Sequence, residues 1–182
     1  EPEEVGEAFS QLKKAGKVRA FGVSNMNPMQ IELLQAGLDM PLVVNQLQFS
    51  LMHATLVDEG FNVNLMRDAG TMRTGGALEY ARLKDMTIQA WSPLQYGFIE
   101  GHFVDNPDYP EVNEALETLA KDRGVTKVAI ALAWILRHPA KIQVLLGSMN
   151  PERITQAADA LKVELTHREW YDLYLAAGHE LP

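Results

Sequence analysis

Apolar residues recur along this chain in two alternating patterns, as short continuous runs and as stripes at helical spacing. The runs predict four strands, over residues 17–23, 42–47, 87–91 and 142–146. The stripes predict helices over residues 2–15, 27–38, 77–84, 111–123, 126–136, 151–161 and from 166 onward. This strand-then-helix order repeats four times, and strands that are apolar throughout are typical of a parallel sheet buried on both faces.

The stretch from Val144 to Ile154 contains the signals of one such unit. We expect a short buried strand over residues 142–146, a tight turn, and then a helix. Asn150 offers a side-chain oxygen that caps the helix, and Pro151 occupies the first helical position, where no backbone donor is needed. The face that this helix should bury is formed by Ile154, Ala157, Ala158 and Leu161.

The same turn has the chemistry of an anion site. Gly147 and Ser148 leave backbone N–H groups uncovered near the positive end of a helix, an arrangement that suits a phosphate. Arg153, in the first turn, adds a planar cation. An ordinary strand-to-helix connection with a surface arginine has the same pattern, so the turn alone leaves both interpretations open.

Four strand–helix units amount to half of a closed barrel, which needs eight strands and typically about 250 residues. We therefore predict an α/β fold in one domain, residues 1–182, forming the second, C-terminal half of a (β/α)8 TIM barrel with four parallel strands. A small open doubly wound sheet is the weaker alternative, because its ligand contacts would gather at one switch point and not after all four strands. Two open sheet edges favour a partner that covers them.

The least regular region lies between His53 and Gly76. It carries four glycines and only short apolar patches, so it predicts no clear helix or strand. A long, weakly patterned segment inside a compact domain is usually a functional lid or an insertion. We expect a long loop over about residues 53–76.

Composition narrows the classes of function. The 182 residues carry a formal net charge of −8, which argues against non-specific binding to nucleic acid. The chain has no cysteine, which excludes disulfides and thiol chemistry and fits a reducing compartment. No stretch approaches the roughly 20 apolar residues that span a bilayer, and the acidic N-terminus is unlike a signal peptide. We expect a cytoplasmic protein without a nucleic-acid or membrane partner.

Four short motifs occur in order, each at the predicted carboxyl end of a strand. They are FGVSN at 21–25, NQ at 45–46, WSPL at 91–94 with Gly97 and Gly101 beyond it, and GSMNPERI at 147–154. Together they resemble the aldo-keto reductase superfamily, and most closely its bacterial branch with WSPL in place of YSPL. The resemblance covers nearly the whole chain, and it implies a TIM barrel and an NADP cofactor.

The resemblance also implies which residues bind the cofactor. Ser24 and Asn25 match the pair that hydrogen-bonds the nicotinamide carboxamide, Gln46 matches its other polar contact, and Trp91 matches the aromatic residue that stacks on the nicotinamide ring. The loop over the pyrophosphate is matched by Ser92, Pro93, Leu94, Gln95 and Gly97.

The end that holds adenosine 2′-phosphate and adenine is matched by Gly147, Ser148, Met149, Arg153 and Gln156. Two of these positions, and the neighbouring Ala157, depart from the family's common pattern. Gly147 stands where lysine is frequent, Gln156 where glutamate is frequent, and Ala157 replaces a frequent asparagine. These departures weaken the expected preference for NADP over NAD and the expected contact to adenine.

The family's catalytic aspartate, tyrosine, lysine and histidine lie at the ends of the first four barrel strands, which the resemblance places outside this chain. No tyrosine of the chain lies in the family's Asp–Tyr motif, and the five histidines show no metal-ligand spacing and are expected at the surface. We therefore predict no catalytic residue and no metal site. His102 is a further candidate, because a cationic residue near the pyrophosphate loop would neutralise phosphate charge.

Three interpretations of function follow. In the first, the chain is the cofactor-binding C-terminal half of an NADPH-dependent carbonyl reductase. It would act on a small-molecule aldehyde or ketone, with its missing N-terminal half as partner, and would be inactive alone. Because the first residue is Glu1, we expect an upstream part to have been lost, cleaved or left out. In the second, it is a non-catalytic nucleotide-binding or regulatory half-barrel that self-associates. In the third, it binds nothing, which the intact cofactor motifs disfavour.

Overall fold

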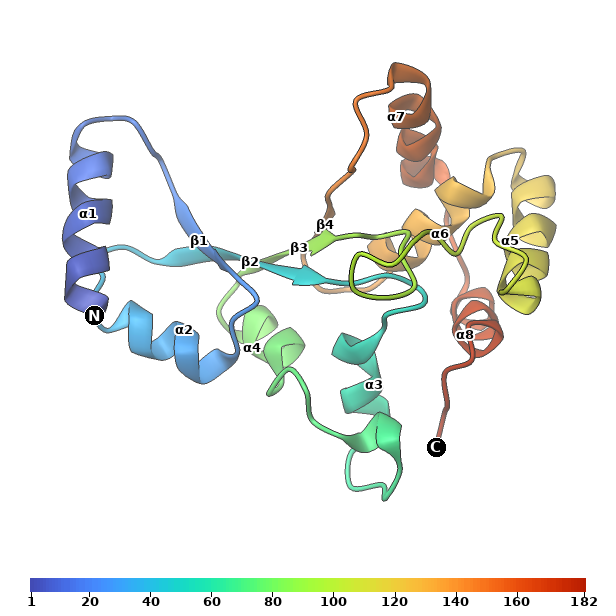
Figure 1. Ribbon diagram of the computed structural model, residues 1–182, viewed down its shortest axis with the longest axis horizontal. Helices are drawn as coiled ribbons and strands as arrows, with labels where there is room; N and C mark the ends of the chain where they lie inside the picture. Colours follow the sequence, from blue (N-terminus) through green and yellow to red (C-terminus); the bar gives the residue numbers. More distant parts are fainter.

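The computed structural model describes residues 1–182 (Figure 1). The strands are β1 Phe21–Ser24, β2 Leu42–Gln48, β3 Thr87–Trp91 and β4 Ile142–Val144. The helices are α1 Pro2–Lys14, α2 Pro28–Gln35, α3 Thr55–Phe61, α4 Ala77–Leu83, α5 Pro110–Arg123, α6 Lys127–Leu136, α7 Pro151–Ala158 and α8 His167–Ala176. Two short 3₁₀ helices, η1 Asp68–Gly70 and η2 Asp159–Lys162, complete the chain. No helix is both long and apolar enough to span a bilayer.

The four strands form one parallel sheet in the order β1-β2-β3-β4, as the repeated strand–helix pattern predicts. Each strand pairs with the next one along the chain, and a helical crossover joins each pair. β1 and β4 each have a neighbour on one side only, so both edges of the sheet are open. Because parallel strands end at the same edge of the sheet, the residues that follow each strand share one rim.

The sheet is buried on one face and open on the other, so the prediction of burial on both faces was wrong. Facing the helices are the buried side chains of Asn45, Leu47, Ile88 and Ala90. The opposite face carries a row of register partners, Ser24, Gln46, Gln89 and Gln143. The glutamines are joined by hydrogen bonds of 3.0 Å (Gln46 to Gln89) and 2.8 Å (Gln89 to Gln143).

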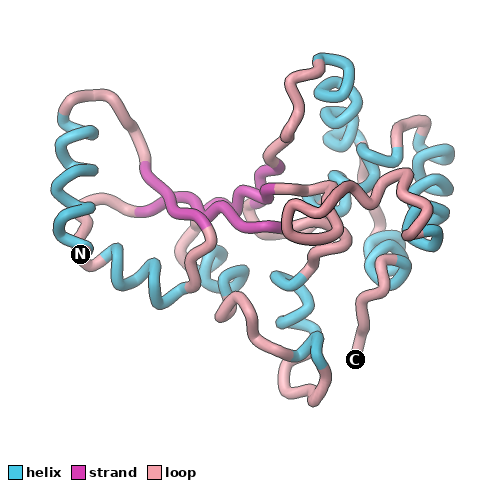
Figure 2. Tube along the Cα trace, in the orientation of Figure 1, coloured by secondary structure: helices cyan, strands magenta, loops and turns pink.

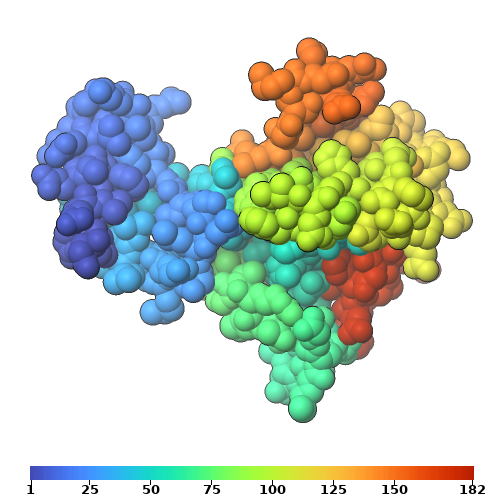
Figure 3. All heavy atoms as spheres, in the orientation of Figure 1, coloured from blue at the N-terminus to red at the C-terminus, as the bar shows by residue number.

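The open face explains the shape of the molecule. Above the strands in Figure 2, between α1 and α7, there is no helix. Figure 3 shows the surface notched there, between the blue residues near the N-terminus and the orange residues near 150. Part of this hollow is a cavity of about 450 Å³ lined by β1, β2 and Gln89 of β3. A row of amide side chains tolerates this exposure better than an apolar row would.

The core gathers around α6, whose residues 129–135 are all buried. Trp134 of α6 and Trp170 of α8 stack with ring centroids 4.7 Å apart. Each indole N–H donates to the other residue's backbone carbonyl oxygen, at 3.0 and 2.9 Å. Tyr174 of α8 is fully buried and extends the stack, with its ring centroid 5.7 Å from that of Trp170. This aromatic cluster fixes α8 against α6 and so closes the core at the C-terminal end.

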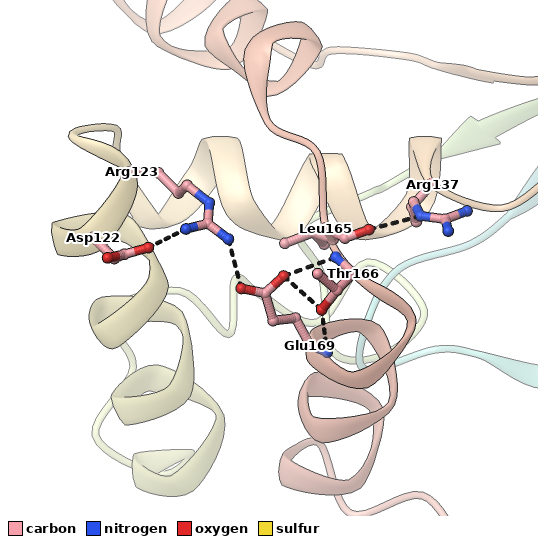
Figure 4. A network of polar contacts seen from close by, with 6 residues as sticks. All are labelled: Asp122, Arg123, Arg137, Leu165, Thr166 and Glu169. Carbon is pink, nitrogen blue, oxygen red and sulfur yellow. Dashed lines mark hydrogen bonds and ion pairs between the residues drawn. The ribbon is translucent and has the colours of Figure 1, made fainter.

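Polar contacts fix the start of α8 (Figure 4). Thr166 and Glu169 form the capping box that their spacing predicts, each side chain accepting the other's backbone N–H. The Arg123 guanidinium at the end of α5 reaches Glu169 at 2.6 Å, and the Arg137 guanidinium donates to the Leu165 carbonyl at 2.7 Å. The helix therefore begins at a point held by two other helices.

Glu169 should make the stability of this corner depend on pH. Hydrogen bonding from the Thr166 backbone, with further help from the Arg123 guanidinium, holds the pKa of Glu169 below its ordinary value of 4.5. A carboxyl group whose pKa is lower in the folded than in the unfolded protein stabilises the fold at pH values above its unfolded pKa. This stabilisation is lost as the pH falls through the folded pKa. We expect Glu169→Ala to cost about 1 kcal/mol at neutral pH, as lost caps do.

Urea unfolding of wild type and Glu169→Ala at neutral and acidic pH checks this prediction. The difference in free energy of unfolding between the two proteins should become smaller below pH 4.5, where Glu169 takes up its proton. The matched control is Glu164→Ala, which removes an exposed carboxylate nearby. Its free energy of unfolding should equal that of wild type at both pH values. A difference in free energy of unfolding that did not change with pH would contradict an electrostatic role of Glu169.

The region 53–76 is not the unstructured loop that its weak pattern predicts. It contains α3 and η1, and Leu56 and Val57 are buried in the core. α3 has too few residues to show a helical period in the sequence. Its stability comes from packing and from the buried carboxylate of Glu59, which no local pattern reveals.

Three other predictions were wrong in part. The first strand begins at Phe21 and not at Lys17, because the Lys17 N–H closes the end of α1 by bonding the Leu12 carbonyl. The last strand, β4, ends at Val144 and not at residue 146, and its residues are partly exposed because it lies at the edge of the sheet. The predicted tight turn before Pro151 is replaced by a longer link without secondary structure.

The predicted apolar face of α7 is buried only at Ala157. Ile154, Ala158 and Leu161 are exposed, whereas Ala157 and Ala160 are buried against α6. The helix turns into the 3₁₀ helix η2 at Asp159, so the repeat shortens from 3.6 to 3 residues. This change rotates Leu161 away from the core, and the small alanines let α7 approach α6 closely.

Candidate active site

The rim at the carboxyl ends of the strands holds a cavity of about 500 Å³ between the end of β3, the loop after it, and the start of α7. Many of the residues predicted to bind a cofactor gather here, although they come from two distant segments of the chain. The polar and aromatic part of the lining is Trp91, Ser92, Gln95, His102, Ser148, Arg153 and Gln156, and the remainder is Pro93, Leu94, Val128, Leu145, Leu146, Gly147 and Ala157.

The charge of this lining is distinctive. Arg153 and His102 are its ionisable side chains, and no carboxylate lines the cavity although the whole chain has a net charge of −8. Neither side chain takes part in an ion pair or a side-chain hydrogen bond to a carboxylate within the chain. A cavity that holds an arginine without an ion-pair partner, and no carboxylate, is suited to an anionic ligand.

The start of α7 forms one end of the cavity. The Asn150 side chain caps the helix as predicted, accepting from the N–H groups of Glu152 and Arg153 at 2.9 and 3.3 Å. Two donors of the first turn are therefore already used. The backbone N–H groups of Gly147 and Ser148 make no hydrogen bond within the chain. An anion here would rely on those two groups and on the Arg153 guanidinium.

The loop after β3 is held in place by β2 and the segment that follows it. The Ser50 hydroxyl donates to the Gln95 carbonyl at 2.7 Å, and the Gln48 amide donates to the Gly97 carbonyl at 2.8 Å. Gln95 also pairs with His102 in an antiparallel bridge. Gly97 therefore supports the loop without lining the cavity. The loop is fixed over the cavity by its own backbone and by two buried or half-buried polar side chains.

Two residues of the rim have an unusual backbone. Asn25 after β1 and Ser92 after β3 have positive φ angles of 52° and 49°. Non-glycine residues in this region carry strain that the surrounding structure must hold, and such residues concentrate at ligand sites. Asn64, Asp85, Ile99 and Asp105 have the same backbone conformation, so a positive φ does not by itself distinguish the two rim positions from the rest of the chain.

Ser24, Asn25 and Gln46 lie together at the ends of β1 and β2. The Ser24 hydroxyl and the Asn25 N–H both donate to the Gln46 carbonyl at 3.0 Å. The Asn25 side-chain oxygen accepts the Trp91 indole N–H at 3.2 Å, which leaves the Asn25 amide nitrogen free to donate. The Gln46 side-chain oxygen makes no hydrogen bond within the chain. A free amide donor and a free amide acceptor together complement a primary carboxamide.

Trp91 separates two cavities of the rim. It lines the 500 Å³ cavity and also a second one of about 410 Å³, and the edge of Phe98 meets its ring at a centroid distance of 5.8 Å. Met149 lies outside both, 94% exposed, so the structure does not bring this predicted residue to the site. It is the residue before a helix cap, and its side chain points into solvent.

The second cavity depends on the buried carboxylate of Glu59, which belongs to none of the sequence motifs. Glu59 of α3 is 8% exposed and accepts the backbone N–H groups of Arg73 and Thr74, the latter's hydroxyl at 2.8 Å as well. This contact holds residues 73–76 at the rim, where Arg73 and Thr74 line the cavity. Glu59 is fourteen and fifteen positions away from these two partners, so no local pattern reveals the contact.

Replacing Glu59 by alanine should release this segment. Two backbone donors would lose their acceptor, which costs roughly 1–3 kcal/mol, and the amide protons of Arg73 and Thr74 should exchange at least about tenfold faster. Hydrogen–deuterium exchange followed by mass spectrometry measures the change. Glu79→Ala, an exposed carboxylate at the start of α4, is the control. Unchanged exchange at Arg73 and Thr74 would contradict the role given to Glu59.

Several tyrosines and histidines have structural roles. Tyr80 donates to Glu32, and burial raises the pKa of Tyr80 to about 12. Tyr174 donates to Asp58 at 2.6 Å, and burial raises its pKa. The expectation of surface histidines was wrong for His53, His138 and His179, which are half-buried. Burial lowers the pKa of the first two.

Comparisons with known proteins bear on this arrangement. The model of the aldo/keto reductase family matches residues 1–174. The chain belongs to the aldo/keto reductase family. This is a family of oxidoreductases, so the resemblance carried by the four motifs is confirmed.

A curated family member, the 6-dehydroglucose reductase of Agrobacterium fabrum, is 40% identical over 180 residues, which are 98% of this chain and 54% of that protein. Oxidoreductase YdhF of Escherichia coli is 32% identical over 99% of this chain and 54% of that protein. The chain thus spans about half the length of the curated relatives it matches.

A solved family structure, the thermostable aldo-keto reductase Tm1743, is 22% identical and superposes with a TM-score of 0.70, over 97% of this chain and 55% of that one. At this identity the likeness concerns the fold. The four strands and their helices correspond to about half of an aldo-keto reductase (β/α)8 barrel, which confirms the predicted half-barrel.

Proposed function

We propose that this chain is the cofactor-binding portion of an NADPH-dependent reductase of aldehydes or ketones. The observation that supports this most is the 500 Å³ cavity, with unpaired Arg153 and His102 and no carboxylate, on a chain of net charge −8. Its volume lies within the range of small-molecule sites. An aldo/keto reductase that binds a phosphate-bearing dinucleotide needs such a cavity.

The residues of the rim have separate tasks in this proposal. Arg153 and the N–H groups of Gly147 and Ser148 hold the 2′-phosphate, and Gln156 lies near the adenine. The loop from Ser92 to Gln95 covers the pyrophosphate. Ser24, Asn25 and Gln46 orient the carboxamide, and Trp91 offers its indole to the nicotinamide and excludes water. The bound cofactor supplies the hydride.

The proton must come from elsewhere. Tyr80 and Tyr174 have raised pKa values and donate to Glu32 and Asp58, so neither is poised as a proton donor. We propose that the acid belongs to a complementary half-barrel, as the motif alignment implies. This chain alone then binds the cofactor without turning over a carbonyl compound.

For the substrate we propose a polyhydroxylated aldehyde. The 410 Å³ cavity beside Trp91 is lined by amide, hydroxyl and cationic side chains together with aromatic rings, which suits a sugar-like molecule. The 40% identical relative is named for reduction of 6-dehydroglucose, an aldehyde of this class. The polar part of this lining is Asn25, Asn27, Gln30, Gln48, His53, Thr55, Arg73 and Thr74.

A complementation assay tests this function. The chain would be fused to the part of the Agrobacterium fabrum reductase that lies outside the matched region, and NADPH oxidation would be followed with 6-dehydroglucose as substrate. We expect the chain alone to bind NADPH without turnover and the fusion to oxidise NADPH. A folded fusion that binds NADPH yet shows no turnover would contradict the proposal, as would absence of NADPH binding.

The open edges of the sheet favour a second candidate, a non-catalytic half-barrel that pairs with another copy of itself. β1 and β4 each lack one neighbour, and the glutamine row on the open face is partly exposed. Light scattering on the purified chain separates the two. A 20.3 kDa species is expected if a different half completes the barrel, and a dimer if a second copy does.

A further inference from the structure

The loop after β3 folds back on itself as a small hairpin, residues 94–103 (Figure 1). The Tyr96 N–H donates to the Gly101 carbonyl and the Phe103 N–H to the Leu94 carbonyl, both at 3.1 Å. An antiparallel bridge lies between these two bonds. Because these contacts join the hairpin only to itself, they fix its shape but not its orientation relative to the sheet.

Two buried side chains at the end of β2 hold this hairpin from outside. The Gln48 amide donates to the Gly97 carbonyl at 2.8 Å, and the Ser50 hydroxyl donates to the Gln95 carbonyl at 2.7 Å. Both donors and both acceptors are two positions apart, so the two bonds join one short stretch of chain to one side of the hairpin. A rotation of the hairpin as a unit would break both bonds and none of its own.

Ser50 belongs to a turn that is fixed independently of the hairpin. The N–H groups of Ser50 and His53 each donate to the other residue's carbonyl at 3.2 Å. The His53 N–H also reaches the Ser50 hydroxyl oxygen at 2.9 Å, which leaves the hydroxyl hydrogen for Gln95. Because a carbonyl only accepts, Nε2 of His179 donates to the Leu51 carbonyl, at 2.6 Å. The turn therefore sets the position of the hairpin.

The hairpin borders both cavities of the rim. Gln95 and His102 line the 500 Å³ cavity, and Phe98 lines the 410 Å³ cavity. Ser50 lines neither of the two, and Gln48 lines only the second. Each of these two side chains can therefore affect a ligand in the first cavity only through the hairpin.

We propose that Ser50 and Gln48 are positioning residues for dinucleotide binding, because their hydrogen bonds hold the hairpin in the orientation that covers the 500 Å³ cavity. This inference rests on the proposed function and adds to it two residues that lie outside that cavity. Without either bond the hairpin keeps its own contacts but samples other orientations. The affinity then falls in proportion to the fraction of molecules that keep the covering orientation.

Two variants remove one donor each with little change of shape. Ser50→Ala deletes the hydroxyl, and Gln48→Met keeps the length of the side chain without its amide. Isothermal titration calorimetry of the whole chain should show that each binds NADP⁺ about three- to tenfold more weakly than wild type, the range expected for the loss of one neutral hydrogen bond. Adenosine 2′-monophosphate lacks the pyrophosphate and should bind both variants as it binds wild type.

Matched controls remove the same groups elsewhere. The Thr118 hydroxyl donates within α5 and the Gln11 amide donates within α1, and both residues are exposed. Thr118→Ala and Gln11→Met should therefore bind NADP⁺ as wild type does.

Amide hydrogen exchange distinguishes orientation of the hairpin from its formation. In Ser50→Ala and Gln48→Met the N–H groups of Tyr96 and Phe103 should stay as protected as in wild type, because the hairpin keeps its own bonds. Fast exchange at both would mean that the two side chains are needed to form the hairpin, and would overturn the positioning role.

The binding outcomes separate this inference from the function on which it rests. Unchanged NADP⁺ affinity in both variants, or an equal loss for NADP⁺ and adenosine 2′-monophosphate, would overturn the positioning role. A loss in one variant alone would assign the role to that residue and overturn it for the other. If Arg153→Ala still weakened NADP⁺ binding, the cavity would remain the cofactor site. If wild type bound no NADP⁺, or if Arg153→Ala had no effect, the proposed function would fall as well.

Discussion

Replacing Arg153 by alanine is expected to weaken NADP⁺ binding by roughly 10- to 100-fold while leaving the fold intact. The guanidinium is exposed at the start of α7 and has no carboxylate partner, so its removal leaves no buried charge behind. A hydrogen bond to a charged group is worth about 1.5–3 kcal/mol, which converts to this range. Fluorescence titration of NADPH and competition by NADP⁺ measure the loss.

Two comparisons make this result specific. Arg168→Ala removes an arginine of α8 that is 89% exposed and distant in sequence from the cavity, and it should change neither affinity nor stability. NAD⁺ lacks the 2′-phosphate, so its weaker binding should respond much less to Arg153→Ala. An equal effect of the two arginine variants, or an equal loss for NAD⁺ and NADP⁺, would show that Arg153 does not hold the 2′-phosphate.

Replacing Trp134 by alanine should remove most of the stability of the fold. The side chain is fully buried, stacks on Trp170, and exchanges hydrogen bonds with it in both directions. Truncation of a buried aromatic residue to alanine costs about 3–5 kcal/mol, and here the carbonyl of Trp170 also loses its donor. Urea unfolding followed by circular dichroism gives the difference directly.

Two further tryptophan variants, both expected to cost less, serve as comparisons for this value. Trp134→Phe keeps a ring in the stack but removes the indole donor, so its cost should be smaller, about 1–3 kcal/mol. Trp91→Ala removes a half-exposed ring at the rim and should affect stability less than either. If Trp134→Ala cost no more than Trp91→Ala, the core could not be organised around α6 and α8 as described.

The parts of the fold that the sequence predicts well are those determined by neighbouring residues. The capping box of Thr166 and Glu169, the Asn150 cap and strand β3 all depend on contacts within a few positions. The apolar helix α6 is also local in this sense, since a helix without a polar face must be buried. For such elements the amino-acid order carries nearly all of the relevant physics.

Other features depend on which segments meet in space. The buried Glu59 carboxylate is defined by the loop at Arg73 and Thr74, and Leu161 is exposed because α7 changes to a 3₁₀ helix against α6. The open polar face of the sheet appears only when Gln46, Gln89 and Gln143 are placed in register. Hydrophobic periodicity contains no information about these partners.

The candidate site likewise has parts that the sequence predicts and parts that depend on distant contacts. The motifs located the rim, and Arg153, Ser92 and Trp91 do line one cavity. Met149 was selected by position within a motif, and its exposure shows that a neighbour of a site residue need not face the site. Arg73 belongs to none of the motifs. It lies at the rim because its backbone N–H donates to the buried carboxylate of Glu59.

The central claim is that the cavity between the β3 loop and α7 binds the phosphates of NADP(H). Amide chemical-shift mapping by nuclear magnetic resonance, with 2′,5′-ADP as ligand, tests it most directly in a chain of 20.3 kDa. We expect saturable shifts concentrated in residues 92–97 and 147–156. Absence of saturable shifts, or shifts confined to residues 53–76 or to the open face of the sheet, would contradict the claim.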